Sequence, residues 1–274
     1  MNTKDILSSI DEADSATIER IVIRLEQREE DPHIAHCRKT YFSKLPIAAA
    51  ERILENGCGT GVVTRMLARQ TELVGQIIGS DNSSELIKIA RQRSIEEGLQ
   101  DQIVYTESDA HSLDFEDDSF DIVLADTLIC HVLDPNKVFA EIVRVVKRDG
   151  LIVIFDGDYA SLSFEYTPDP ALGKTMDEAL RQTAYANPNI MRKLPGMLLE
   201  YGMELVEIIP HVLIEVGAAS DRLSFIDTHT HHTPQTGLVT EKQMDIWLAW
   251  QYRAMKEGHF FGVCNYYSYI ARRI

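Results

Sequence analysis

Three glycines at alternate positions form the most informative run of the chain. Residues 53–61 read Ile-Leu-Glu-Asn-Gly-Cys-Gly-Thr-Gly, in which an apolar strand end meets Glu55 and then Gly57, Gly59 and Gly61. A helix-like run follows at once. Glycines at a strand-to-helix turn let the backbone bend tightly and let a ligand approach it, and the helix behind them offers free N–H groups. This pattern predicts a site for a nucleotide-type cofactor.

Three features favour S-adenosylmethionine (SAM) over NAD as that cofactor. The spacing is G-x-G-x-G, whereas the dinucleotide fingerprint needs a glycine where this chain has Val62. Glu55 lies two residues before the first glycine, where a carboxylate suits a ligand with an amino group and a sulfonium better than a pyrophosphate. Acids also follow three later predicted strands, at Asp81, Asp109 and Asp126. Asp81 alone does not discriminate, because NAD enzymes place an acid about 20 residues past the glycines.

The motifs around these acids resemble those of class I SAM-dependent methyltransferases, nearest to the small-molecule group that includes the ubiquinone/menaquinone biosynthesis methyltransferases. The resemblance covers roughly residues 45–160. It departs at Asn56, Arg148 and Asp149, where an apolar residue, proline and glycine are usual. The matching segments are Glu55-Asn-Gly-Cys-Gly-Thr-Gly61, Asp81-Asn82, Ser108-Asp109-Ala110, Phe120-Asp-Ile-Val123, His131-Val-Leu-Asp-Pro135 and Glu141-Ile-Val-Arg-Val-Val-Lys-Arg-Asp-Gly150.

The resemblance implies roles for the residues at the methionine end of the cofactor. The backbone at Gly57, Gly59 and Gly61 would pack against the methionine part and the sugar of SAM. Glu55 would bind the amino group, directly or through water. Asp126 would lie near the methionine end.

The same resemblance implies roles at the nucleoside end. Asp81 would accept both ribose hydroxyls, and Asn82 would lie beside the adenine. Asp109 would accept the adenine amino group, with the N–H of Ala110 nearby. Arg38 matches, more weakly, a position from which a side chain of relatives reaches the SAM carboxylate or the substrate.

Candidate catalytic residues follow the fourth and fifth predicted strands. Methyl transfer from a sulfonium is an in-line displacement, so the protein mainly aligns the acceptor and excludes water. A general base is needed only when the acceptor must lose a proton. His131 lies in the loop after the fourth strand, and Asp156 and Tyr159 are expected to close the fifth strand and face the pocket. The alternatives are a histidine that supports its loop and ordinary turn chemistry.

The run Asp227-Thr-His229-Thr-His231-His232 could suggest a metal site. Catalytic zinc needs three well-placed protein ligands and an ordered outer shell, and one ligand-rich loop does not supply them. We therefore expect no metal. The sequence favours a polar lid loop, with a histidine that contacts the substrate as the alternative.

Alternating strands and helices predict the fold class. Strands are expected at 51–55, 75–80, 103–107, 120–125 and 151–155, and helices at 60–69, 84–97 and 136–147. This spacing implies parallel pairing in a three-layer α/β fold, with ligands beyond the carboxyl ends of the strands. The family resemblance extends this to a Rossmann-like, mostly parallel seven-stranded sheet, whose antiparallel C-terminal hairpin would be formed by the predicted strands 204–216 and 260–270.

The flanking segments complete a single domain. Residues 1–50 are expected to form an N-terminal helical lid. Its helix over 12–30 could cover the cofactor or, equally, only pack against the domain. Residues 51–160 form the SAM-binding core. Residues 161–274 form the rest of the same domain: helices over 170–201, the edge hairpin, and an insertion at 217–258 with one helix from Glu241 to Met255.

Composition limits the possible partners and compartment. The 274 residues carry a formal net charge of −16, which disfavours nucleic acid. No apolar stretch approaches the roughly 18 residues of a membrane span, and no signal peptide is evident. Four scattered cysteines without metal spacing indicate reduced thiols and a cytoplasmic protein (Cys37, Cys58, Cys130 and Cys264). The sequence is compatible with a homodimer.

These observations predict SAM-dependent methyl transfer to a small organic molecule that is quinone-like, aromatic or a secondary metabolite. S-adenosylhomocysteine would be the product form of the cofactor. A protein or RNA methyltransferase is the first alternative, and the acidic charge and the absence of an appended recognition module count against it. A non-catalytic SAM-binding partner is the second alternative.

Overall fold

One seven-stranded sheet organises the chain. The computed structural model describes residues 14–70, 75–165, 169–217, 226 and 229–274. The strand order is β3-β2-β1-β4-β5-β7-β6, with β7 antiparallel to both of its neighbours and the remaining neighbouring strands parallel. The predicted mostly parallel sheet with an antiparallel C-terminal hairpin is therefore confirmed. The strands are β1 Arg52–Asn56, β2 Gln76–Asp81, β3 Ile103–Glu107, β4 Phe120–Asp126, β5 Val146–Phe164, β6 Met203–Val216 and β7 Phe261–Arg273.

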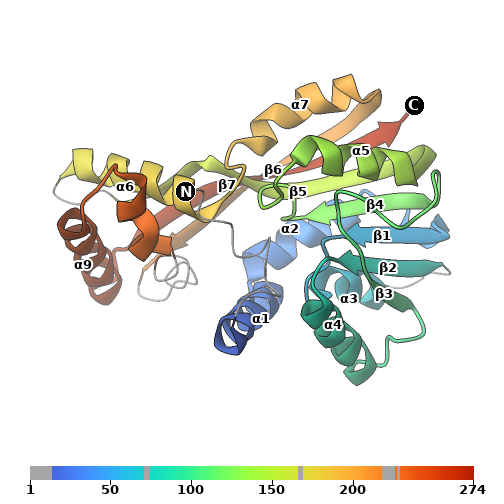
Figure 1. Cartoon of the computed structure of the whole chain (residues 1–274), viewed down its shortest axis with the longest axis horizontal. Coiled ribbons are helices and arrows are strands. Elements are labelled where there is room, and N and C mark those ends of the chain that lie inside the picture. Colours follow the sequence, from blue (N-terminus) through green and yellow to red (C-terminus); the bar gives the residue numbers. More distant parts are fainter. Residues whose placement is uncertain (1–13, 71–74, 166–168, 218–225, 227–228) are drawn as a thin grey trace.

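Helices cover both faces of this sheet. In Figure 1, α5 and α7 lie on one side of the sheet, and α3 and α4 lie on the other. The long strands β5, β6 and β7 continue beyond this α/β part to a smaller helical part that contains α6 and α9. The helices are α1 Ser15–Glu30, α2 Pro32–Phe42, η2 Ile47–Ala49, α3 Val62–Arg69, α4 Ser84–Glu96, α5 Pro135–Val145, α6 Pro170–Ala184, α7 Ile190–Glu200, η3 Thr230–Thr236 and α9 Glu241–Glu257.

Local capping explains where several helices begin and end. The Ser83 hydroxyl accepts a hydrogen bond from the Leu86 N–H at the start of α4, and Gly98 follows that helix with a φ of 71°. Ser83 and Gly98 thus mark the two ends of this helix. Helix α2 was not expected, although Asp31 and Pro32 form a strong start signal: Asp31 caps the helix and Pro32 occupies its first turn.

Strand β5 corrects one prediction. It extends to Phe164 rather than ending near residue 155, because β7 continues to pair with it. Asp156 lies opposite Tyr267, and Asp158 lies opposite Asn265. Asp156 and Tyr159 therefore lie within a long strand, and the expectation that they close it is wrong.

The helical part is built on this strand extension. The predicted helical region 170–201 consists of two helices, α6 and α7, and its apolar anchors Met176, Leu180, Leu194 and Leu198 are all buried. The connection between β6 and β7 contains α9, as expected, and also the short helix η3. Helix α6 packs against η3, α9 and β5, so the helical part forms one wall beside the carboxyl ends of the strands.

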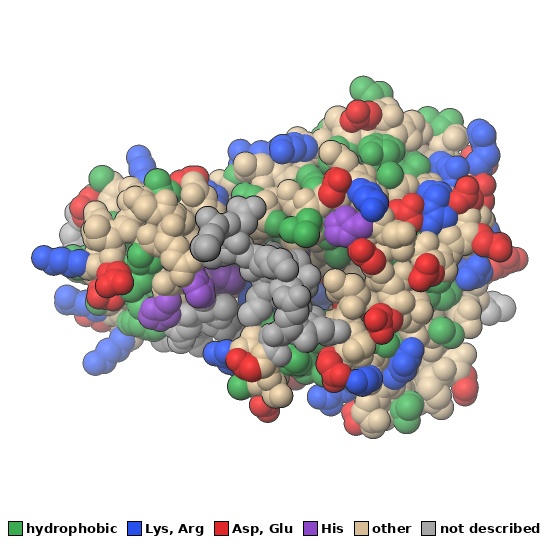
Figure 2. All heavy atoms as spheres, viewed as in Figure 1, with side chains coloured by type: hydrophobic (Ala, Val, Ile, Leu, Met, Phe, Trp, Pro, Cys, Tyr) green, Lys and Arg blue, Asp and Glu red, His purple; other side chains and the backbone are tan. Residues whose placement is uncertain are grey.

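The face shown in Figure 2 carries acidic and basic side chains interspersed, and histidines gather where the helical part meets the α/β part. All four cysteines lie within the described residues, where they are buried and form no disulfide. Within the described ranges, no helix combines the length and apolarity that a membrane crossing requires.

Candidate cofactor and acceptor site

A cavity of about 950 Å³ lies at the carboxyl ends of β1, β2 and β4. The glycine loop and the strand-end acids line one part of it. Residues of α1, the loop after β4, strand β5 and the helical part line the rest. The cavity thus joins the segment expected to bind a cofactor to the segments expected to bind an acceptor.

The glycine loop requires glycine at its three positions. Gly57, Gly59 and Gly61 have φ values of 78°, 53° and 79°, in the left-handed region that other residues avoid. The N–H groups of Gly57 and Cys58 donate to the Ser80 carbonyl at 2.8 and 2.9 Å, which fixes the loop to β2. Gly61 does not line the cavity. A Cβ on Gly61 would lie 2.3 Å from the Tyr105 hydroxyl oxygen, so this glycine serves close packing beneath the loop.

Asp81 is held rigidly at the end of β2. One carboxylate oxygen accepts the Gly59 N–H at 2.8 Å, and the other accepts the Ser83 N–H at 3.0 Å. These bonds tie Asp81 to the glycine loop and orient it toward the cavity, which Asn82 and Ala110 also line. The arrangement suits a carboxylate that accepts ligand hydroxyls, because its position is set before a ligand arrives.

Asp109 lies at the cavity rim. Its Oδ1 accepts the His111 N–H at 2.9 Å and lies 2.8 Å from the His111 Nδ1. Partial burial would raise the pKa of this carboxyl, but the hydrogen bonds from His111 outweigh it and lower the pKa. Asp109 is therefore ionised, and its exposed carboxylate can accept a hydrogen bond from a ligand.

A buried ion pair lies beneath the cavity. The Arg38 Nε and Nη2 donate to the two oxygens of Asp126 at 3.0 Å each, and the Tyr41 hydroxyl donates to Asp126 Oδ2 at 2.9 Å. Burial would raise the pKa of Asp126, but the Arg38 guanidinium outweighs it and lowers the pKa. Arg38 and Asp126, predicted as separate ligand contacts, thus form one bidentate unit from α2 and β4 that lines the cavity.

Glu55 provides the test of whether a cationic cofactor fits. Its side chain is buried and lines the cavity, and its Oε2 has no hydrogen-bond partner within the described part of the chain. Burial, and then the nearby Asp126 carboxylate, raise the pKa of Glu55 well above its usual value. A ligand ammonium would satisfy this oxygen and restore the charge. The glycine loop and the acids at the strand ends therefore fit the methionine and nucleoside parts of SAM.

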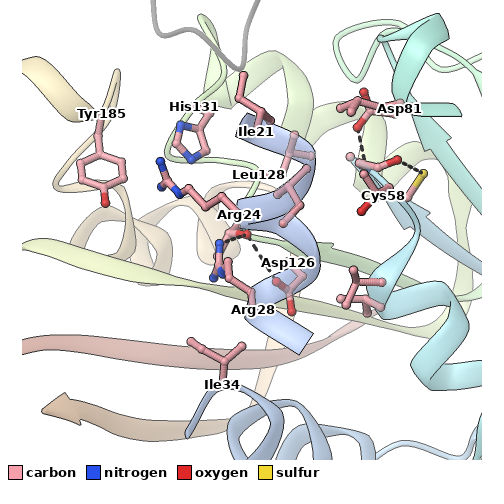
Figure 3. Close-up of a pocket in the computed structure, with 18 of the residues that line it drawn as sticks. Ile21, Arg24, Arg28, Ile34, Cys58, Asp81, Asp126, Leu128, His131 and Tyr185 are labelled. Carbon is pink, nitrogen blue, oxygen red and sulfur yellow. Dashed lines mark hydrogen bonds between the residues drawn. The ribbon is translucent and has the colours of Figure 1, made fainter. Parts of the chain in front are cut away.

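Helix α1 lies across the glycine loop. A Cβ on Gly59 would lie 3.3 Å from Leu25 Cδ1, and Arg65 of α3 binds Glu26 of α1 at 2.8 Å. Figure 3 shows Cys58 and Asp81 on one side of α1, with His131 and Tyr185 on the other. This position suits the lid that the sequence predicted for the N-terminal segment.

An aromatic wall forms the other side of the cavity. Tyr159 stacks on Tyr185 with ring centroids 3.4 Å apart, and the ring of His131 lies 5.6 Å from Tyr185. The Tyr159 hydroxyl lies 3.3 Å from that of Tyr266. His131 and Tyr159 were predicted as site residues, whereas Tyr185 was not, because it lies in a segment without a recognisable motif. The wall offers a planar, largely apolar surface to an acceptor.

Asp156 does not line the cavity. It is fully buried, and its oxygens accept the N–H groups of Cys130 and Gly157 at 3.1 and 2.8 Å. The Tyr159 hydroxyl also donates to it at 3.3 Å. Burial raises the pKa of Asp156, although His131 opposes this. The geometry suits a positioning role for the His131 loop and for Tyr159, rather than direct contact with substrate.

Two arginines of α1 line the cavity and were not predicted as site residues. Figure 3 shows Arg24 reaching toward His131 and Tyr185. The Arg28 Nη1 donates to the Thr127 hydroxyl at 3.2 Å. The sequence signal that could have identified them is the recurrence of arginine at every fourth position, 20, 24 and 28, which places these side chains along one helix face.

The histidine-rich segment lies beside the aromatic wall. His231 and His232 line the cavity, and the buried ring of His229 stacks at 6.5 Å from that of Tyr185. Burial, and then the charges of Arg24 and neighbouring histidines, lower the pKa of His229 to about 3, so this ring is neutral at pH 7. Asp227 lies outside the described residues. Within the described ranges, no three His, Cys, Asp or Glu side chains are grouped as a metal would require.

The chain has the fold of class I methyltransferases, with acids at the strand ends around a glycine loop. Residues 54–154 match a family model described as "Methyltransferase domain". The YcgJ protein of Bacillus subtilis has a similar fold, with a TM-score of 0.60 and 20% identity over 88% of this chain and 99% of that chain. The predicted fold class is therefore confirmed, and SAM is the cofactor that the family match supports.

Two curated relatives place the chain more closely. A demethylmenaquinone methyltransferase of Lactobacillus johnsonii is 36% identical over 43% of this chain and 49% of its own length. An uncharacterised protein of transposon TN4556 from Streptomyces fradiae is 28% identical over 86% of this chain and 66% of its own length. The chain thus spans about half of the length of the first relative and about two thirds of the length of the second. The predicted resemblance to the quinone-biosynthesis methyltransferases is confirmed.

Proposed function

We propose that this protein transfers the methyl group of SAM to a small organic molecule with a planar, largely apolar body. The observation that carries the proposal is the single cavity in which a glycine loop with strand-end acids faces an aromatic wall. The family match and the similarity to a demethylmenaquinone methyltransferase support it. The wall residues Tyr159, Tyr185 and Tyr266 would bind the acceptor face.

The side chains of the cavity have distinct parts in this proposal. When bound, SAM supplies an electrophilic methyl group. Glu55 would bind the ligand ammonium, Asp81 the ribose hydroxyls and Asp109 the adenine. Helix α1 and the aromatic wall would exclude water and orient the acceptor for in-line attack. His131 would accept a proton at a ring nitrogen if the acceptor must lose one, with Asp156 positioning its loop.

The test follows a labelled methyl group. Purified protein is incubated with methyl-labelled SAM and a metabolite extract, and label is counted separately in small molecules and in precipitated macromolecules. Label in a small product supports the proposal, and the mass of that product begins to identify the acceptor. Label only in the precipitate would indicate a macromolecular substrate. SAM binding without any transfer would indicate a binding role.

A further inference from the structure

Building on the proposed function, we propose that Arg24 binds an anionic group of the acceptor, a carboxylate or a phosphate. The acceptor would then be an aromatic or similarly planar molecule that carries an acid. Three observations on the described residues carry this inference: the placement of the Arg24 guanidinium, its lack of an acidic partner and the adjacent aromatic wall.

Arg24 lies where an acceptor would bind. Arg24 and Arg28 occupy one face of α1, four residues apart, and both line the cavity, but Arg28 lies beside Thr127 and Asp126. Figure 3 shows Arg24 directed toward His131 and Tyr185, and away from Cys58 and Asp81 on the other side of the helix. A ligand group that meets Arg24 would therefore lie on the aromatic side of the cavity, beyond the glycine loop.

Neither guanidinium forms an ion pair or hydrogen bond with a carboxylate among the residues that the structure describes, although Arg28 lies near enough to Asp126 to lower the pKa of that carboxyl. No hydrogen bond or ion pair within this described part involves the Arg24 side chain. Arg28 donates to a neutral hydroxyl, and its Nη2 is buried with no hydrogen-bond partner. Other arginines of this acidic chain are paired with carboxylates: Arg38, Arg65, Arg69, Arg144 and Arg192. A buried donor without a partner is costly, so an unpaired arginine in a cavity points to an anionic ligand.

The surroundings specify the rest of the ligand. The stacked pair Tyr159 and Tyr185 presents a planar surface beside the Arg24 guanidinium, and His229, buried behind Tyr185, adds no positive charge of its own at pH 7. Of the acids that line the cavity, Glu55, Asp81 and Asp109 are assigned to the cofactor, Asp126 is paired with Arg38, and Asp31 caps α2. Glu215 also lines the cavity, but it forms no ion pair with Arg24. An acid group on a planar body would thus meet a guanidinium in a partly desolvated pocket, where such a pair is strongest.

The experiment compares three probes on the same aromatic ring. Naphthoate, its neutral amide and naphthyl phosphate are titrated calorimetrically into protein saturated with S-adenosylhomocysteine. We expect the wild type to bind at least one of the two anions about ten-fold more tightly than the amide. The relative affinity of naphthoate and naphthyl phosphate shows which acid the site prefers. In Arg24→Gln the preference for the anion should disappear, while the amide binds as before.

Matched variants separate this role from general effects of charge. Arg93→Gln removes an exposed arginine of α4 that pairs with Glu96, and it should retain the full preference. Arg24→Lys retains the charge without the planar fork and should retain part of it. Equal binding of acid and amide by the wild type, an unchanged preference in Arg24→Gln, or no binding of any probe would each overturn the inference. S-adenosylhomocysteine is titrated into the wild type before the probes are added. Failure of the wild type to bind it would instead contradict the proposed function itself.

Discussion

The two sides of the cavity are built in different ways. On the cofactor side, the ligand-facing acids lie at or just beyond the ends of strands, and Asp81 is fixed there by the N–H groups of Gly59 and Ser83. On the acceptor side, the surface comes from segments far apart in sequence, including Arg24, Tyr185 and Tyr266. The cofactor side is therefore set by local motifs and the acceptor side by tertiary packing.

This difference predicts which side of the cavity tolerates substitutions. A change in the glycine loop meets positive φ angles and close packing, so the cofactor side tolerates little. The acceptor side consists of side chains on long strands and added helices, which can change without disturbing the loop. One SAM-binding frame can thus serve different acceptors, and the following predictions test whether the two sides respond separately.

The largest effect is expected from breaking the buried ion pair of the cofactor side. Asp126→Asn leaves the Arg38 guanidinium buried without a counter-charge, which should lower the free energy of unfolding by about 3–5 kcal/mol. The exposed pair of Lys44 and Glu207 provides the control, because Glu207→Gln should cost less than about 1 kcal/mol. Urea denaturation at pH 7 measures both. Equal effects of the two substitutions would contradict the importance of burial here.

The pH dependence of the same pair has a defined sign. The pKa of Asp126 is lowered from 3.8 in the folded protein, because Arg38 outweighs the effect of burial. Its stabilising contribution is therefore present above that value and is lost as the pH falls through the lower folded pKa. The Asp126→Asn variant should lack this part of the acid sensitivity.

A buried acid of the helical part, outside the cavity lining, should show the opposite dependence. Asp177 of α6 accepts the Ser163 hydroxyl at 3.1 Å, while its Oδ1 has no hydrogen-bond partner within the described residues. Burial raises its pKa from 3.8 to about 7, so its contribution to stability is present below 3.8 and is lost as the pH rises through about 7. Asp177→Asn should therefore stabilise the protein at pH 8 by roughly 2–4 kcal/mol.

Thermal denaturation at pH 5 and pH 8 measures this change. The exposed Asp245 of α9 is the matched control, and Asp245→Asn should leave the stability nearly unchanged at both values. SAM affinity of Asp177→Asn should equal that of the wild type, because Asp177 is not on the cofactor side. A stability gain that is the same at both pH values would show that charge burial is not its cause.

An intermediate effect is expected at Asp81. Asp81→Ala removes the carboxylate proposed to accept the ribose hydroxyls and also frees the Gly59 N–H. Losing a charge-assisted hydrogen bond costs about 1.5–3 kcal/mol, so SAM should bind about ten- to a hundred-fold more weakly. Isothermal titration measures the affinity, and a melting curve shows whether the variant is still folded. An unchanged affinity would contradict the assignment of Asp81.

The sequence predicted the cofactor side far better than the acceptor side, for physical reasons. Glycines at a turn and acids at strand ends are short-range signals, so β1, β2 and β4 could be located with their acids. The length of β5 could not, because it depends on pairing with β7 about a hundred residues later. Tyr185 and Tyr266 carry no local signal, and only the folded chain brings them to Tyr159.

The smallest effect tests whether α1 is a lid or simple packing. Leu25 lies over the glycine loop and lines the cavity. Val22 is an apolar residue three positions earlier on α1 that does not line the cavity. Helix α1 has no fully buried residue, so Leu25→Ala and Val22→Ala should each change stability by less than about 1.5 kcal/mol. If α1 covers the cofactor, only Leu25→Ala should release SAM faster, by about two- to ten-fold in stopped-flow measurements. Equal release rates in the two variants would favour packing, because a lid requires contact at the loop itself.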